Sequence, residues 1–231
     1  MLSNNKQEIA KSYFDTIILK DVISRFKIKE QEVLIRLARF YLTSIGSRIT
    51  FNSIARFLKL PIKTVYNFSI YLEKAYLIFF VKRFSFSIKV KENSPRKVYS
   101  IDNVFPCIIG ENSIKIKGRL LENVAASTLY LISKNSNDFE FYYWNEYGKE
   151  VDFIIKDSGK YRLVQVAYSI NDEKTRERGL SSILECANRM NIDRLEIVTM
   201  NYDYEEVIAG KKIRYINASE WIKEILKDHG F

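Results

Sequence analysis

Acidic and amide side chains lie in two neighbouring segments of the sequence, Trp144–Ile155 and Leu163–Ala167. Both segments have the composition of β-strands, and side chains on a strand alternate between its two faces. Glu150 and Asp152 therefore point the same way, and Gln165 lies on one face of the next strand. Oxygen ligands from adjacent strands are what a hard divalent cation such as Mg²⁺ or Mn²⁺ requires. The spacing predicts a divalent-cation site at the edge of a small sheet.

The elements around these strands predict a mixed α/β domain over residues 111–231. Helical and strand patterns follow one another in the order αβββαββα, which is typical of a small central sheet with helices packed on it. The expected helices cover residues 117–133, 172–190 and 218–226, and the expected strands cover residues 139–144, 150–156, 161–168, 195–200 and 213–216.

A different pattern over residues 30–110 predicts a winged helix-turn-helix. Pro61 marks the start of the second helix of the helix-turn-helix, a position where the missing N–H of proline is tolerated. Two strands are expected to enclose the basic tip 89–97 and to form a β-hairpin, the wing. Residues 1–29 hold a further amphipathic helix, over 7–25, which is expected to be an arm for docking or dimerisation. The expected elements of the winged domain are helices over 30–43, 52–58 and 62–75 and strands over 77–81 and 98–101.

Polar and cationic side chains of this winged domain are the expected DNA contacts. Lysines and arginines would contact phosphates, which position a protein on DNA without specifying sequence, and Thr64 and Asn67 would contact base edges. The alternative is a winged helix that contacts another protein and never touches DNA. The expected contacts are Lys63, Thr64, Asn67, Lys74, Lys89, Lys91, Arg96 and Lys97.

The positive charge of the chain is concentrated in its first half. Residues 1–110 contain 19 Lys and Arg against 8 Asp and Glu, whereas residues 111–231 contain 18 against 20. A positive field steers a protein toward phosphate and makes binding sensitive to salt. The asymmetry therefore favours nucleic acid as the partner.

The composition is that of an ordered globular protein, with 47% hydrophobic residues and only 3 Pro and 8 Gly. No apolar run approaches the roughly 20 residues of a membrane span, and the first residues lack a signal-peptide core. We therefore expect a cytoplasmic protein with no membrane contact. Cys107, Cys186 and the single histidine His229 are too few for a His/Cys metal site or for histidine-based catalysis.

The order helix-Glu, strand-Asp, strand-Gln, helix resembles the PD-(D/E)XK nuclease superfamily, whose fold is that of restriction endonucleases. The resemblance implies that Glu122 on the helix, Asp152 and Gln165 hold one or two Mg²⁺ or Mn²⁺ ions, which activate a water for attack on a phosphodiester. Two alternatives concern single residues. Glu122 could be a solvated helix acid paired with Arg119, and Gln165 could cap a neighbouring strand.

The position of the family's lysine differs in this chain. That lysine normally lies two residues after the third ligand and orients the attacking water, but Ala167 stands there. The resemblance therefore implies a Mg²⁺-dependent nuclease with a degenerate lysine motif. Lys174 in the following helix is the first candidate to take over the role of that lysine, and Arg176 and Arg178 are further candidates.

Segments along nearly the whole chain look like the C-terminal region of archaeal AAA-type ATP-binding proteins, which couples a winged helix to a nuclease-like domain. This chain has no G-x-x-x-x-G-K-[ST] phosphate loop, so no ATP site is expected in it. The expected function is DNA binding combined with a nuclease-like domain. The alternative is a non-catalytic DNA-binding or interaction module that serves an AAA-type ATPase, and a homodimer is a further expectation. The matching segments are Tyr13–Ile18, Tyr71–Phe79, Asn93–Asn103, Gly118–Asn123, Tyr143–Trp144, Glu150–Ile154 and Leu163–Val166.

Overall fold

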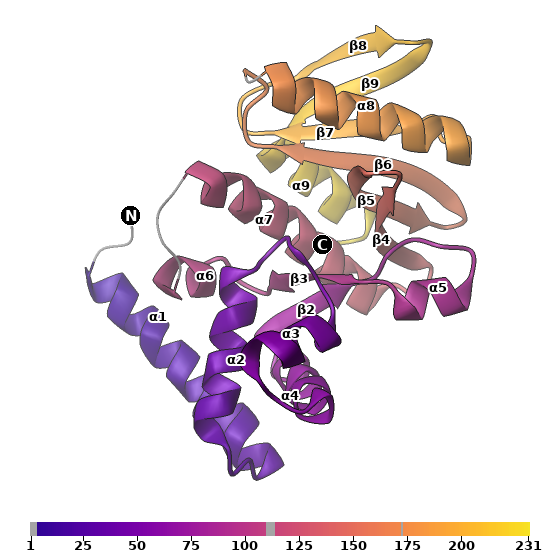
Figure 1. Ribbon diagram of the computed structural model, residues 1–231. Helices are drawn as coiled ribbons and strands as arrows, with labels where there is room; N and C mark the ends of the chain where they lie inside the picture. The colour runs from indigo at the N-terminus through magenta and orange to yellow at the C-terminus, as the bar shows by residue number, and fades with distance from the viewer. Residues whose placement is uncertain (1–3, 110–113, 172) are drawn as a thin grey trace. The chain divides into compact units, whose positions relative to one another are not determined.

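The computed structural model describes residues 4–109, 114–171 and 173–231 and divides into two compact units (Figure 1). The mixed α/β class is confirmed, because helices and two β-sheets are both present. No helix within the described ranges is long and apolar enough to cross a membrane. The first unit contains Met1–Phe80 and Ser94–Ile116, and the second contains Val81–Asn93 and Lys117–Phe231.

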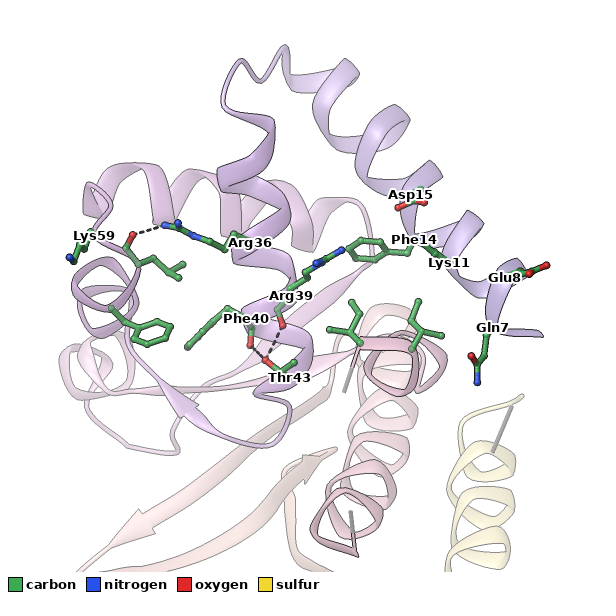
Figure 2. Close-up of a pocket in the computed structure, with 14 residues that line it drawn as sticks. Gln7, Glu8, Lys11, Phe14, Asp15, Arg36, Arg39, Phe40, Thr43 and Lys59 are labelled. Atoms are coloured by element: carbon green, nitrogen blue, oxygen red, sulfur yellow. Dashed lines mark hydrogen bonds between the residues drawn. The ribbon is translucent and has the colours of Figure 1, made fainter. Parts of the chain in front are cut away.

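The first unit consists of helices packed around a three-stranded sheet with the order β1-β3-β2. The helices predicted over residues 30–43, 52–58 and 62–75 are confirmed. Four of the helices, α1, α2, α3 and α6, surround an open groove (Figure 2). The elements are α1 (Asn4–Thr16), the π-helix η1 (Ile17–Ser24), α2 (Gln31–Thr43), β1 (Arg48–Ile49), α3 (Phe51–Leu58), α4 (Ile62–Lys74), β2 (Ile78–Val81), β3 (Arg96–Ser100) and α6 (Val104–Ile109).

Local signals fix the turn between α3 and α4. Thr50 caps α3 by accepting a hydrogen bond from the Ser53 N–H at 3.0 Å, and the Ser53 hydroxyl accepts one from the Thr50 N–H at 3.3 Å. Lys59 ends α3 in the left-handed conformation with φ 56°. Pro61 precedes the first turn of α4 in an extended conformation. The geometry of the helix-turn-helix therefore follows from local capping and turn residues that can be recognised in the sequence.

The N-terminal helix is part of the core of the first unit and does not form the separate arm expected from the sequence. Phe14, Ile18 and Val22 are at most 4% exposed and belong to the same apolar cluster as Leu34 and Leu37 of α2. Burial of each such side chain stabilises a fold by about 1.5–3 kcal/mol. The helix predicted over residues 7–25 is present, but it packs against its own unit.

The connection between β2 and β3 differs from the predicted wing. The expected hairpin tip is instead a short helix, α5 (Ile88–Asn93), and the whole segment groups with the second unit. Phe84 is 7% exposed in the core of that unit, and its N–H donates to the carbonyl of Tyr143 at 2.7 Å. The two strands expected for the wing are present and are neighbours in the sheet, but the residues between them contain a helix and a segment around Phe84 that packs beside β4, so they do not form a simple hairpin.

The second unit is a six-stranded sheet with the order β4-β5-β6-β7-β9-β8. β5 pairs antiparallel with both β4 and β6. β7 pairs parallel with both β6 and β9, and β8 pairs antiparallel with β9. All predicted elements of this unit are present, and β8 is an addition. The elements are α7 (Ile114–Asn135), β4 (Phe139–Glu146), β5 (Lys149–Asp157), β6 (Lys160–Ala167), α8 (Glu173–Met190), β7 (Leu195–Thr199), β8 (Tyr204–Ile208), β9 (Lys211–Asn217) and α9 (Ala218–Asp228).

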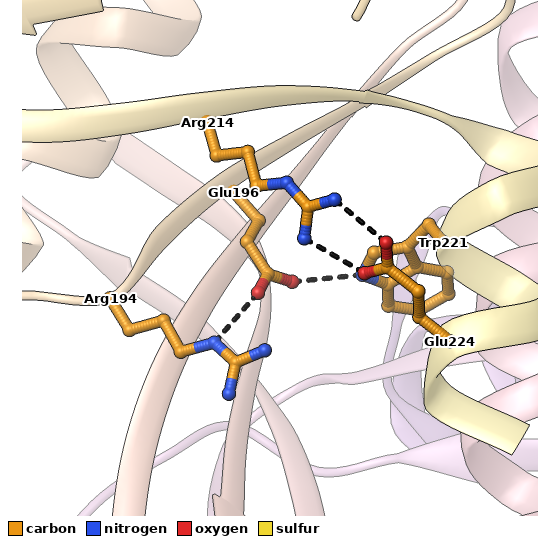
Figure 3. Close-up of polar contacts among 5 residues, drawn as sticks. All are labelled: Arg194, Glu196, Arg214, Trp221 and Glu224. Carbon is orange, nitrogen blue, oxygen red and sulfur yellow. Dashed lines mark hydrogen bonds and ion pairs between the residues drawn. The ribbon is translucent and has the colours of Figure 1, made fainter. Parts of the chain in front are cut away.

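Polar side chains hold α9 on one face of this sheet (Figure 3). Glu196 on β7 is 3% exposed and accepts hydrogen bonds from Trp221 Nε1 at 2.9 Å and from Arg194 Nε at 2.8 Å. Arg214 on β9 donates to both carboxylate oxygens of Glu224, at 2.8 and 2.7 Å. A buried carboxylate is costly unless it is paired, so Glu196 fixes the position of the Trp221 ring.

The packing of α1 gives a stability prediction. Replacing Phe14 with alanine should lower the free energy of unfolding of the first unit by about 3–5 kcal/mol, because a buried aromatic side chain is lost. Ile9→Ala, at a side chain that is 48% exposed in the same helix, should change it by less than about 0.5 kcal/mol. Urea unfolding followed by circular dichroism measures both. Equal effects of the two substitutions would mean that α1 is not packed in the core.

Candidate functional site: a carboxylate where two strands separate

The strands β5 and β6 separate at Asp152. Their backbones pair from Asp157 and Lys160 to Phe153 and Val164, and β6 continues alongside β7 as far as Ala167. Asp152 follows directly beyond that paired region and is 6% exposed. We refer to this point, defined by Asp152, Gln165 and Val166, as the fork.

The Asp152 carboxylate bridges the fork with two hydrogen bonds. Oδ2 accepts one from Gln165 Nε2 at 2.6 Å and one from the backbone N–H of Val166 at 3.0 Å. The side chain thus takes the place of the next backbone hydrogen bond between the strands. Bonds to an ionised acceptor are stronger than neutral ones, so this contact fixes where the two strands part.

The other end of the Gln165 amide is an unsatisfied acceptor. Because Nε2 has to face the carboxylate, Oε1 must point away from it. Oε1 is buried and has no hydrogen-bond partner within the part of the chain that the structure describes. An unpaired buried acceptor costs about 1–3 kcal/mol. A cation would relieve that cost, so this oxygen fits the expected Mg²⁺ or Mn²⁺.

The structure brings together Asp152 and Gln165, two of the three predicted ligands. Glu122 is half-buried on α7, and Glu150 is half-buried at the start of β5. Among the described residues, no three His, Cys, Asp or Glu side chains form a group that could hold a metal ion. Glu122 as a third ligand therefore stays a prediction.

The basic groups that could replace the missing lysine lie on α8. The helix packs beside the fork, since a Cβ placed on Gly179 would lie 3.7 Å from Gln165 Cγ. Arg176 donates to both oxygens of Glu206, at 3.1 and 3.0 Å, and hydrogen bonding with Tyr215 and Glu206 raises its pKa. Arg178 is exposed, and the side chain of Lys174 lies outside the described part of the chain.

Neither cysteine is prepared for nucleophilic chemistry. Burial raises the pKa of the Cys186 thiol to about 12, and burial together with Asp102 raises that of Cys107. A cysteine reacts as its thiolate, which both environments disfavour near neutral pH.

The predicted DNA contacts on α4 are presented to solvent to different degrees. Lys63 and Lys74 are exposed, whereas Thr64 and Asn67 are half-buried. Sequence reasoning missed Arg56 and Lys59, which are exposed at the end of α3 and line a shallow hollow with Pro61. Their position at the end of α3, directly before Leu60 and Pro61, was the signal that could have identified them.

The cations predicted for the wing have different surroundings. Lys89 is exposed on α5, but Lys91 is half-buried, with its Nζ 4.3 Å from the centre of the Tyr142 ring and 3.1 Å from its hydroxyl. Arg96 lies over Phe51 at 5.4 Å, and Lys97 is 1% exposed. The prediction that Lys97 contacts DNA was wrong, because this side chain is packed in the interior.

Two family models match the chain. Residues 2–108 match a domain of unknown function (DUF8612), and residues 117–220 match a second domain of unknown function (DUF4143). The matched segments meet close to the boundary near residue 110 that the sequence predicts.

Two relatives match over most of this chain. "Uncharacterized protein MJ1544" of Methanocaldococcus jannaschii is 31% identical over 217 residues, which are 90% of this chain and 48% of the relative. An uncharacterized protein of Haemophilus influenzae is 23% identical over 221 residues, which are 91% of this chain and 51% of the relative. The chain thus spans about half the length of these curated relatives. No solved structure matches it.

The contact across the fork gives a prediction about charge. Gln165→Glu would place a second carboxylate about 2.6 Å from Asp152, and two carboxylates at that distance share one proton. The folded variant would then hold a proton that the unfolded chain has lost, so its stability should fall by about 1–3 kcal/mol as the pH rises from about 4 to 7.

Thermal melts of Gln165→Glu at several pH values, with and without Mg²⁺, measure this effect. Added Mg²⁺ should restore the melting temperature at pH 7, because a cation can neutralise the pair. Gln165→Leu is the control, since it removes the hydrogen bond without adding charge: its pH dependence should come from the lost donor alone, and added Mg²⁺ should reverse it less than in Gln165→Glu. A Gln165→Glu protein that melts like the wild type at every pH would contradict the described geometry.

Proposed function

We propose that the protein binds DNA through the helix-turn-helix of α3 and α4. The observation that carries the proposal is the set of exposed cations around the turn: Arg56 and Lys59 at the end of α3, and Lys63 in the first turn of α4. Lysine and arginine at such positions contact phosphates, and the first turn of the second helix is the part that reaches base edges in proteins of this type.

The outer face of α4 carries groups suited to contact bases and sugars. Ile62 and Tyr66 are 48% and 47% exposed, so both side chains are accessible to a partner on this face of α4. Apolar groups contact thymine methyl groups, and Asn67 can pair with adenine. The proposed DNA surface therefore consists of a cationic turn and a mixed face on α4.

A role beside an AAA-type ATPase is the alternative use of the same surface. It rests on the resemblance of the sequence segments and on the relatives, which are about twice as long as this chain. In that role the first unit would bind DNA, or a protein, on behalf of the ATPase. DNA binding without any cleavage in Mg²⁺ or Mn²⁺ would favour this alternative, which is non-catalytic.

The DNA proposal gives a measurable salt dependence. Lys63→Ala should weaken binding to duplex DNA about tenfold and reduce the slope of log K against log salt by about 1, because one phosphate contact is lost. Fluorescence anisotropy with a labelled duplex at several salt concentrations measures both quantities. Lys227→Ala, at an exposed lysine of α9, is the matched control and should leave both unchanged. Binding that is indifferent to Lys63 and to salt would exclude this surface.

We propose metal-dependent phosphodiester hydrolysis as a second function, on the basis of the fork. The second unit has a helix, three antiparallel strands, a helix and a strand parallel to the third, which is the order of a PD-(D/E)XK-like fold. Asp152 and Gln165 would hold Mg²⁺ or Mn²⁺, with Glu122 as the third ligand. A bound divalent ion supplies charge neutralisation and an acidified water. Gln165 contributes no charge, so Asp152 is the main anionic ligand at the fork.

Cleavage assays test this second function. The wild-type protein should cleave single-stranded, duplex or branched DNA in Mg²⁺ or Mn²⁺, and Asp152→Asn should lower the rate at least about 100-fold because the anionic ligand is lost. Asp138→Asn, at an exposed acid next to β4, is the control. Lys174→Ala tests the proposed substitute for the lysine. Cleavage that persists in Asp152→Asn would come from a contaminant.

A further inference from the structure

The groove of the first unit is a second surface, which adjoins the proposed DNA surface at Lys59, and none of the described residues that line it belongs to α4. It has a volume of about 1090 Å³ and is lined by α1, α2, α3 and α6 (Figure 2). Its apolar lining includes Phe14, Phe40, Leu58, Ile108 and Ile109. Such a volume exceeds that of most small-molecule pockets, and an open apolar groove of this kind is suited to a segment of protein.

One face of α2 forms the floor of the groove. Arg36, Arg39, Phe40 and Thr43 line it, and their spacing of three, four and seven residues places them on a single stripe of the helix. The opposite stripe, with Leu34, packs in the core. The groove stripe extends over about 10 Å, or two helical turns. A short helix laid along it would find side-chain positions that repeat at the same interval.

Phe57 of α3 supplies an aromatic anchor at the edge of the groove. It is 70% exposed, and its ring centre lies 5.6 Å from that of Phe40, which is half-buried. Single exposed apolar side chains are common, but Phe57 and Phe40 lie together at the groove and form one continuous apolar patch with its lining. An apolar side chain inserted between the two rings would bury area on both.

Cations predominate at the rim of the groove. Lys11, Arg36, Arg39 and Lys59 face two acids, Glu8 and Asp15, and all six side chains are exposed. Figure 2 shows Arg36 and Arg39 leaving α2 toward opposite sides, with Arg36 Nη2 donating to the carbonyl of Leu58 at 2.6 Å. Charge of this sign favours a partner with carboxylates on both flanks.

We propose that this groove binds an acidic amphipathic helix of a partner protein. Apolar side chains at positions i, i+3 or i+4, and i+7 of that helix pack on Phe40, Phe57 and the isoleucines of α6. Carboxylates on its flanks pair with Arg36 and Arg39. The apolar lining of Phe14, Phe40, Leu58 and the isoleucines of α6 favours this occupant over a nucleic-acid backbone, which would have only the cations to bind.

Selection from a displayed peptide library tests the proposal with the full chain. The library holds apolar residues fixed at helical spacing, and its other positions vary among Glu, Lys, Gln and Ala. We expect the recovered peptides to be enriched in Glu and depleted in Lys. Failure to enrich any peptide, or enrichment without preference for Glu over Lys, would overturn the proposal.

A recovered peptide, labelled and measured by fluorescence anisotropy, then locates the site. Phe57→Ala and Arg39→Glu should each weaken its binding about tenfold, because both residues are exposed and lie at the groove. Phe86→Ala, at a phenylalanine that is 84% exposed in the second unit, and Lys227→Glu on α9 are the matched controls. Thermal melts confirm that all four variants are folded. Equal affinity in the groove and control variants would overturn the proposal, and so would a loss of duplex-DNA binding in the groove variants with unchanged peptide binding.

Discussion

The second unit depends on one buried carboxylate. Asp152 is 6% exposed, and a charge in that position is tolerated only when donors surround it, as Gln165 Nε2 and the Val166 N–H do. Those two donors come from β6 at the point where it leaves β5 to follow β7. The hydrogen-bonding requirement of the Asp152 carboxylate thus determines where the antiparallel pair β5–β6 ends and the parallel pair β6–β7 continues. It also determines where the oxygen atoms of Asp152 and Gln165 lie, which could bind a cation.

The first unit is governed by apolar burial. The stripe Phe14, Ile18 and Val22 closes its core from one side, and α2 contributes Leu34 and Leu37 from the other. The apolar faces of these helices pack against each other, so only their outer faces are accessible to partners. The turn between α3 and α4 and the groove along α2 are two such outer faces, and they differ in chemistry: the first carries cations and polar groups, whereas the second carries aromatic rings within a cationic rim.

The sequence allowed most elements to be predicted but fewer of the site contacts. The strand around Asp152 was recognisable because apolar residues flank the acid on both sides. The helix starts at Thr50 and Pro61 were also recognisable, because local residues specify them without any long-range contact. β8 was missed because its residues alternate between half-buried and exposed and include two glutamates, which resembles a loop. The helix α5 was missed because it is only 6 residues long and none of its side chains is buried, so it carries no apolar periodicity. Pairing of Asp152 with Gln165 could be expected from strand order, whereas the place of Glu122 depends on helix packing that spacing does not encode.

The segments α1 and η1 form one continuous helix, and the π-helical turns of η1 (Ile17–Ser24) determine how its core-facing side is rotated relative to the groove-facing side of α1. Wider turns in this segment place Ile18, Val22 and Ile23 together in the core, while Lys11 and Asp15, upstream in α1, line the groove. Each residue of an α-helix advances the side chains by about 100°. A single insertion or deletion in this segment would therefore turn the groove wall away from α2 while leaving every contacting residue type in place. The length of this stretch is therefore constrained as tightly as its composition, because a change in residue number would disturb the core and the groove together.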